Sequence, residues 1–166
     1  MRPSDRDIEL EGRAEEALKG LLRQSSAIQI SEIRMAEPDS AGSVDFVALI
    51  RLLGHSRTLV CKISCKGDVR CIRASLKALR EYASSVDAAV TPLLIVPSFS
   101  SRTRELCSEC GTGYLDFEGN ARLEIGELFI RRRSLPQSTA RPLDRFPPVA
   151  FRPAAATHSL KQARSA

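Results

Sequence analysis

A continuous apolar run, Leu93-Leu94-Ile95-Val96, constrains the fold of this chain more than any other segment. A strand that is apolar on both of its alternating faces is typical of the centre of a sheet covered on both sides. Two β-rich segments, 44–53 and 57–65, precede the run and are joined by a turn at Gly54-His55-Ser56. A helix is predicted between segment 57–65 and the run. Because such a helix is a crossover, we expect strands 57–65 and 91–96 to be parallel.

Helices are predicted on both sides of this sheet. Apolar residues recur at helical spacing along 7–23 (Ile8, Ala14, Leu18, Leu21 and Leu22). A second helix is expected from Gly67-Asp68 to about Ser84, with Asp68 as N-cap, and a third from Ser98 or Ser100 to Cys110. The remaining predicted strands are 27–35, with an irregularity at Ser31, and 113–117, 122–125 and 128–132.

The fold class that follows is α/β. We expect an αβββαβ core with a mixed sheet flanked by helices, followed by a β-rich C-terminal extension. The 166 residues suffice for one domain, which we place at 1–133. Residues 134–166 hold five of the nine prolines and no apolar period, and this pattern predicts a disordered tail.

The charge balance argues against a generally basic surface. The net charge is +5. The tail alone contributes +4, from four arginines and one lysine against Asp144, which leaves about +1 for residues 1–133. No apolar run reaches the roughly 18 residues of a membrane span, and the N-terminus has no apolar signal region, so we expect a cytoplasmic protein.

Five cysteines and two histidines could in principle bind a metal. Cys107-x-x-Cys110 has the spacing of half a zinc site, but the other three cysteines are scattered over predicted strand, loop and helix. We therefore expect reduced thiols that act as small apolar residues in or near the core.

Asp45 and Lys62 are the residues whose types and spacing indicate chemistry. Metal-dependent phosphodiester hydrolysis needs at least two carboxylates on a divalent cation and benefits from a lysine. Asp45 begins one predicted strand, and Lys62 lies on the next. Asp45 and Lys62 are the candidate catalytic residues, vestigial or weak, and Asp45 is the candidate metal ligand. A strand-end carboxylate with no function explains Asp45 equally well.

Strand alternation leaves this site one carboxylate short. Val60, Lys62 and Ser64 share one face of the predicted strand. If Lys62 is the catalytic lysine, Val60 stands where the second acid is needed. If Ser64 occupies the lysine position, Lys62 replaces the acid and would repel a cation. Helix residues could supply the missing acid, but the sequence does not place them; the candidates are Glu11, Glu15, Glu16 and Asp68.

The element order, with Asp45 and Lys62-Ile63-Ser64, resembles the PD-(D/E)XK, or restriction-endonuclease-like, superfamily. Residues 44–132 are similar, more narrowly, to the nuclease-like domain of bacterial type IV toxin–antitoxin (AbiEi-type) antitoxins and transcriptional regulators. The segments that carry this resemblance are 65–70, 92–100 and 111–120, the last reading Gly-Thr-Gly-Tyr-Leu-Asp-Phe-Glu-Gly-Asn. The acid-x-Lys pattern of the superfamily is Lys62-x-Ser64 here, so its catalysis does not carry over.

Two further patterns have both a functional and a structural explanation. A basic stripe follows one face of the second predicted helix (Arg70, Arg73, Lys77 and Arg80) and could contact phosphates, although a solvated helix face gives the same pattern. Asp116 to Asn120 could bind a ligand, but these residue types also stabilise a tight hairpin turn.

These observations predict a nuclease-derived, catalytically impaired domain that binds nucleic acid, in particular DNA, or a partner protein such as a toxin. The implied setting is prokaryotic defence, toxin–antitoxin control or transcription, and a homodimer fits it. The alternative is a Mg²⁺-dependent nuclease that uses Asp45, a helix glutamate and Lys62. Otherwise the sequence implies no cofactor.

Overall fold

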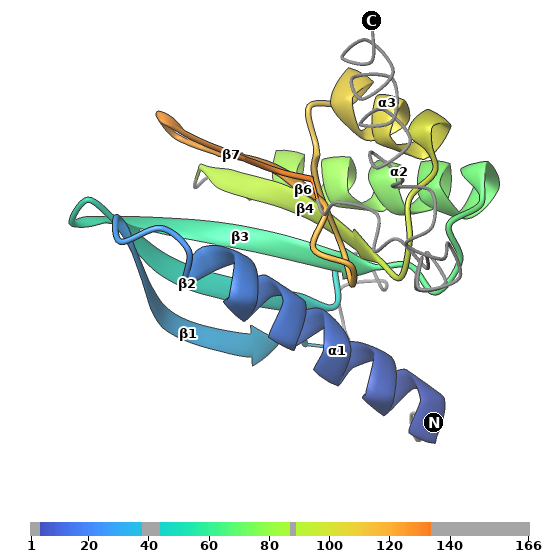
Figure 1. The fold of residues 1–166 in the computed structure, drawn as a ribbon, viewed down its shortest axis with the longest axis horizontal. Coiled ribbons are helices and arrows are strands. Elements are labelled where there is room, and N and C mark those ends of the chain that lie inside the picture. The colour runs from blue at the N-terminus through green and yellow to red at the C-terminus, as the bar shows by residue number, and fades with distance from the viewer. Residues whose placement is uncertain (1–3, 38–43, 87–88, 134–166) are drawn as a thin grey trace, which may run out of the picture. The chain divides into compact units, whose positions relative to one another are not determined.

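The computed structural model describes residues 4–37, 44–86 and 89–133, which form a mixed sheet with helices on both faces (Figure 1). The elements in chain order are α1 (Asp5–Leu22), β1 (Ile28–Met35), β2 (Phe46–Leu52), β3 (His55–Ile63), α2 (Val69–Ser85), β4 (Val90–Val96), α3 (Ser101–Glu109), β5 (Gly113–Asp116), β6 (Ala121–Ile125) and β7 (Leu128–Arg132).

The strands lie in the sheet in the order in which they occur in the chain, from β1 at one edge to β7 at the other. Strand β4 pairs in parallel with β3 and with β5, and the other neighbours are antiparallel. The predicted parallel pairing of the third and fourth strands is therefore confirmed. So is the αβββαβ order of the first six elements, and with it the α/β fold class.

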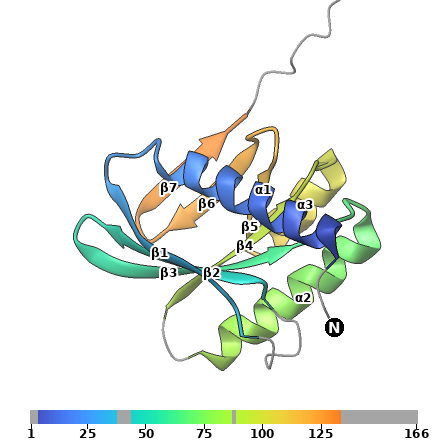
Figure 2. The ribbon, with the colours of Figure 1, turned by 90° about the horizontal axis from the view of Figure 1, so that it is seen from below.

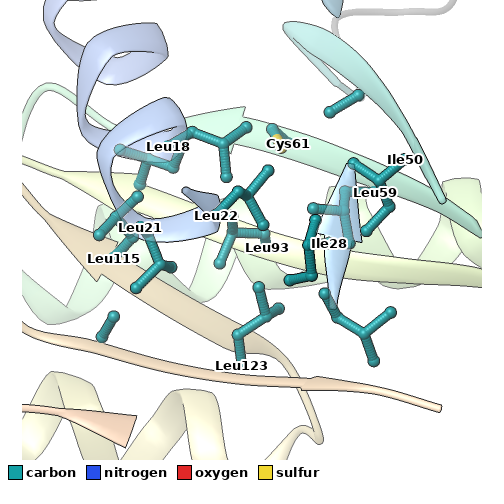
Figure 3. Packing of buried hydrophobic residues seen from close by; sticks show 14 of the residues in the cluster. Leu18, Leu21, Leu22, Ile28, Ile50, Leu59, Cys61, Leu93, Leu115 and Leu123 are labelled. Carbon is teal, nitrogen blue, oxygen red and sulfur yellow. The ribbon is translucent and has the colours of Figure 1, made fainter. Parts of the chain in front are cut away.

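Two apolar clusters, one on each face of the sheet, hold the helices in place. Helix α1 covers one face, and α2 and α3 cover the other (Figures 1 and 2). Leu18, Leu21 and Leu22 of α1 pack with residues of β2, β3, β4 and β6 (Figure 3). The run from Leu93 to Val96 is fully buried because its residues alternate between the two clusters. Strand β4 is thus the centre of the fold, as its sequence predicts.

The helix boundaries follow from their caps. Helix α1 begins two residues earlier than predicted because the Ser4 side chain accepts a hydrogen bond from the Asp7 N–H and the Asp7 carboxylate accepts one from Ser4. Asp68 caps α2 as predicted, and Ser100 caps α3. The irregularity in β1 lies between Ile30 and Glu32, where the sequence places it.

Three expectations from the sequence need correction or lie outside the described residues. Ile8, assigned to the buried face of the first helix, is 54 % exposed because it lies on the first turns of α1. Cys61 and Cys107 are buried, but Cys65 is exposed on the loop after β3, so the core assignment is wrong there. The predicted tail, 134–166, lies outside the residues that the structure describes.

The two candidate explanations of the cysteines can also be compared with the structure. Among the described residues, no group of three or more His, Cys, Asp and Glu side chains is placed to hold a metal ion. Burial raises the pKa of the Cys107 thiol to about 12, and the negative charge of Cys110 adds to this increase. Among the described residues, no helix combines the length and the apolar character that crossing a membrane requires.

Truncation of Leu18 should show how strongly α1 is held to the sheet. Leu18→Ala removes a fully buried side chain from the cluster under α1 and should lower the free energy of unfolding by about 2–5 kcal/mol. Urea denaturation measures this change. Ile8→Ala, an exposed position on the same helix, is the matched control and should change stability by no more than about 0.5 kcal/mol. Equal effects of the two substitutions would contradict this packing.

Candidate functional site

Asp45 lies immediately before β2, where its backbone is fixed by both neighbouring strands. Its N–H donates to the Cys61 carbonyl at 2.8 Å, and its carbonyl accepts from the Ala36 N–H at 2.9 Å. The residue therefore extends the pairing of β1, β2 and β3 by one step beyond the ends of β1 and β2. Its position is set by the sheet and not by a flexible loop.

The Asp45 carboxylate is bound by the neighbouring strand through both oxygens. Oδ2 accepts a hydrogen bond from the Ile63 backbone N–H at 2.6 Å, and the Lys62 Nζ lies 3.5 Å from Oδ1. The two side chains are 28 % (Asp45) and 19 % (Lys62) exposed, so the ion pair is only partly shielded from water. The structure thus places the two candidate catalytic residues side by side.

The position of a second acid on β3 is occupied by a buried valine. Val60 precedes Lys62 by two residues on the same face and is 1 % exposed. It packs in the apolar cluster under α2, with Ile72 and Leu76. Ser64, the other candidate for the lysine position, donates its hydroxyl hydrogen bond to the Lys66 carbonyl at 2.8 Å. The structure therefore pairs Lys62, and not Ser64, with Asp45.

Among the four candidate helix carboxylates, Glu11 is the one whose pKa is raised by the charge of Asp45. Burial raises the pKa of the Glu11 carboxyl, and the negative charge of Asp45 and then of Asp7 raises it further. The other candidates are engaged elsewhere: Glu15 forms an ion pair with Lys19 at 2.6 Å, and Asp68 caps α2. Glu16 is exposed. The sequence offered all four residues without a means of choosing among them, because the choice depends on how α1 crosses the sheet.

Asp45 beside a lysine makes a poor site for a tightly held divalent cation. Mg²⁺ binds through one or two carboxylates and several waters, and Asp45 is the carboxylate that this site offers on its strands. However, both oxygens of Asp45 already accept from Ile63 and Lys62, and the ammonium group would repel a cation. The donor set therefore does not fit a resident metal ion.

Cys61 lies beside this site but has no chemical role in it. Burial raises the pKa of its thiol far above the ordinary value, and the negative charge of Asp45 raises it further. A thiol held in its neutral form is a weak nucleophile.

The basic stripe of α2 has the geometry that the sequence predicts. Its four side chains are exposed, whereas Ile72, Leu76 and Leu79 of the same helix are buried against the sheet. Lys77 lies 3.8 Å from Glu81. Arg70, Arg73 and Arg80 make no ion pair with any residue that the structure describes. The stripe starts just after the loop that leaves β3, and it therefore begins at the end of the sheet where Asp45 and Lys62 lie.

Asp116 stabilises the β5–β6 turn. It is buried, and its Oδ1 accepts from the N–H groups of Glu118 and Asn120 at 3.0 and 2.8 Å. Its Oδ2 accepts from the Asn120 side-chain amide at 2.8 Å. Gly119 provides the positive φ of 89° that the turn requires. These contacts support the structural explanation of this segment.

Comparisons with known proteins give only distant structural neighbours. No family model and no curated protein matches the chain. Three solved structures are similar to part of it: a repair endonuclease from Pyrococcus abyssi (14 % identity, TM-score 0.46), EndoMS in apo form (13 %, 0.42) and an EndoMS–dsDNA2 complex (15 %, 0.39). The alignments cover 70, 70 and 61 % of this chain but only 47, 47 and 43 % of those chains.

Such scores are too low to transfer an activity or a residue's role, so function must be argued from the residues of this chain. None of the comparisons bears on the narrower resemblance to AbiEi-type antitoxins. That resemblance stays a prediction.

The role of Asp45 in the fold can be separated from its charge. Asp45→Ala leaves the Ile63 N–H without its acceptor and should cost about 1–3 kcal/mol of stability, measured by urea denaturation. Asp45→Asn keeps an acceptor oxygen at the same place and should cost less. If the two variants are equally stable, the hydrogen bond to Ile63 does not support the sheet.

The proximity of Glu11 to Asp45 has a consequence for pH dependence. Because the folded-state pKa of Glu11 lies above its value in the unfolded chain, its ionisation opposes folding as the pH rises through that range. Glu11→Gln should therefore melt at a higher temperature than the wild type at pH 7, and this gain should vanish below about pH 4. Thermal denaturation across this range measures it. A gain that persists at low pH would show that it does not come from the ionisation of Glu11.

Proposed function

We propose that this domain is a nuclease-derived module that binds DNA and hydrolyses it poorly or not at all. The single observation that carries the proposal is Val60, an apolar and buried side chain at the strand position where the second acid would stand. Beside it, Lys62 neutralises Asp45 where a hydrolytic site would use a cation.

DNA binding is supported by the position of the basic groups. The stripe on α2 presents Arg70, Arg73 and Arg80 without ion-pair partners among the described residues, so these side chains are available for phosphates. Lys62 lies at the end of the sheet from which the stripe starts. This arrangement offers a path for a phosphate backbone along α2 toward the Asp45–Lys62 pair.

A metal-dependent nuclease is the second candidate function, and one observation favours it. The charge of Asp45 raises the pKa of Glu11, so a helix glutamate lies within electrostatic reach of Asp45, although α1 covers the face of the sheet opposite to Val60. The two candidates differ in what Mg²⁺ does to bound DNA. Cleavage that depends on Glu11, Asp45 and Lys62 would establish the second function over the first.

The biological setting is the least constrained part of the proposal. The resemblance stated above implies prokaryotic defence, toxin–antitoxin control or transcriptional regulation, with a toxin as partner protein and a homodimer as the assembly. The hypothesis that the chain binds a partner protein is tested by co-purification with a protein encoded next to its gene. The hypothesis that it binds nucleic acid is tested by measuring the DNA affinity of the isolated chain.

The duplex-binding prediction can be tested by salt titration. Arg73→Ala combined with Lys77→Ala should weaken binding of a labelled DNA duplex. It should also reduce the slope of log K against log[salt] by about 1.8, which is about 0.9 for each lost phosphate contact. Fluorescence anisotropy measures both quantities. The double variant Arg34→Ala, Arg51→Ala removes the same charge from exposed positions on β1 and β2 and should leave the slope unchanged. If the two double variants have equal salt slopes, the stripe on α2 does not contact the phosphates of the duplex.

The hydrolysis prediction uses the same protein with Mg²⁺ or Mn²⁺ and supercoiled plasmid. The wild-type chain should not nick the plasmid above the level seen with Asp45→Asn, which keeps the hydrogen bond to Ile63. Metal-dependent nicking that is absent from both Asp45→Asn and Glu11→Gln would overturn catalytic impairment and establish the nuclease reading.

A further inference from the structure

A second cationic surface lies away from Asp45, between α3 and the β6–β7 hairpin. It is an open groove of about 660 Å³, within the range of about 300–1,000 Å³ that small-molecule sites occupy. Arg104 lies on the α3 side with Glu105 and Glu109, and Phe129 and Arg131 lie on the hairpin side. Arg122 and Arg133 also line the groove. We call this surface the α3–β7 groove.

Strand alternation explains why charged and aromatic groups gather here. Leu123, Ile125 and Ile130 point to the face covered by α1 and belong to or pack against its apolar cluster. Their neighbours therefore point to the other face. The antiparallel register sets Arg131 opposite Arg122 and Phe129 opposite Glu124, which places one exposed ring among the arginines.

The charge of the groove is unbalanced. Its carboxylates already have partners: Glu105 and Glu109 lie 3.3 and 3.8 Å from Arg102, and Glu124 lies 3.1 Å from Arg122. By contrast, Arg104, Arg131 and Arg133 form no ion pair within the described part of the chain. Three guanidinium groups thus line one groove without an ion-pair partner among the described residues.

Phe129 is held in place although it is half exposed. Its ring is 51 % exposed, and the Arg122 guanidinium lies 5.7 Å from the ring centroid. Arg122 is itself fixed, because it donates to the Ser108 hydroxyl at 2.8 Å and to Glu124 at 3.1 Å. A large apolar ring positioned in this way loses little conformational freedom when a flat group stacks on it.

We propose that the α3–β7 groove binds single-stranded nucleic acid, with a base stacked on Phe129 and phosphates contacted by Arg104, Arg131 and Arg133. An aromatic platform among unpaired arginines matches unpaired bases on a phosphate backbone. The bases of a duplex are stacked inside it and cannot reach the ring. An acidic peptide would match the arginines but would leave the ring without a partner. The chain's own residues 134–166 carry a net charge of +4, so the charge of the groove disfavours them as its occupant.

This surface is separate from the α2 stripe and does not rest on the function proposed above. The stripe lies on α2, and the groove is made by α3, β5, β6, β7 and the adjacent Arg133. Loss of duplex binding in the Arg73→Ala, Lys77→Ala variant with retained single-strand binding would therefore separate the two surfaces.

The test measures the affinity of the full chain for labelled oligodeoxyuridylate and oligouridylate, which differ only in the sugar, by fluorescence anisotropy over a range of salt concentrations. Arg131→Ala with Arg133→Ala should reduce the salt slope by about 1.4, at about 0.7 for each contact on a single strand. Phe129→Ala should lower affinity about 5- to 150-fold without changing the slope. Met35→Ala, which truncates a side chain with the same exposed fraction (52 %), is the matched control and should have no effect.

A direct readout of stacking is available because the chain has no tryptophan. Phe129→Trp should retain binding, and its fluorescence should be quenched by the oligonucleotide but not by polyglutamate of similar charge. Tight binding of either oligonucleotide with these responses supports the proposal, and the stronger of the two identifies the sugar. Absence of binding to both, or affinity insensitive to Phe129→Ala, overturns it. Displacement of the oligonucleotide by polyglutamate at equal charge also overturns it and indicates an acidic peptide.

Discussion

The parallel pairing of β3 with β4 is the constraint on which the rest of the structure depends. It requires a crossover, which α2 provides, and it places β4 where both faces are buried. The polar groups discussed above lie on other elements, at a strand end or toward the β7 edge of the sheet. The Asp45–Lys62 pair lies at such an end, and the α3–β7 groove lies at such an edge.

The local elements of this fold could be predicted from sequence because their signals are local. The apolar run of β4, the N-cap Asp68 and the irregularity near Ser31 each depend on a few adjacent residues. The exposure of Ile8 could not, because it depends on how far α1 extends beyond the sheet. The start of α1 is a different case, because the capping box of Ser4 and Asp7 is a local signal that the sequence prediction did not use.

The sequence could predict only the part of the candidate site that is formed by strands adjacent in the chain. Asp45 and Lys62 lie on strands joined by a tight turn, so their proximity follows from hairpin register. Glu11 is remote in sequence, and its approach to Asp45 depends on the packing of α1 across the sheet. The α3–β7 groove had no sequence signal as a unit, because Arg104 and Phe129 come together only through the order of β5, β6 and β7. Arg131 and Arg133 are close together in the sequence and by themselves would indicate only a basic segment.

The Asp45–Lys62 pair supports the fold whether or not a metal ion binds beside it. Removing one partner of a partly buried ion pair leaves a charge without compensation, which costs stability whatever the site does. Asp45 also supplies the acceptor for the Ile63 N–H, so the sheet needs its carboxylate independently of any cation. Val60 has no such link to a polar partner, and as an apolar residue it adds to the cluster under α2. Asp45, immediately before β2, therefore supports the fold without a cation, whereas a carboxylate in place of Val60 would be buried in an apolar cluster.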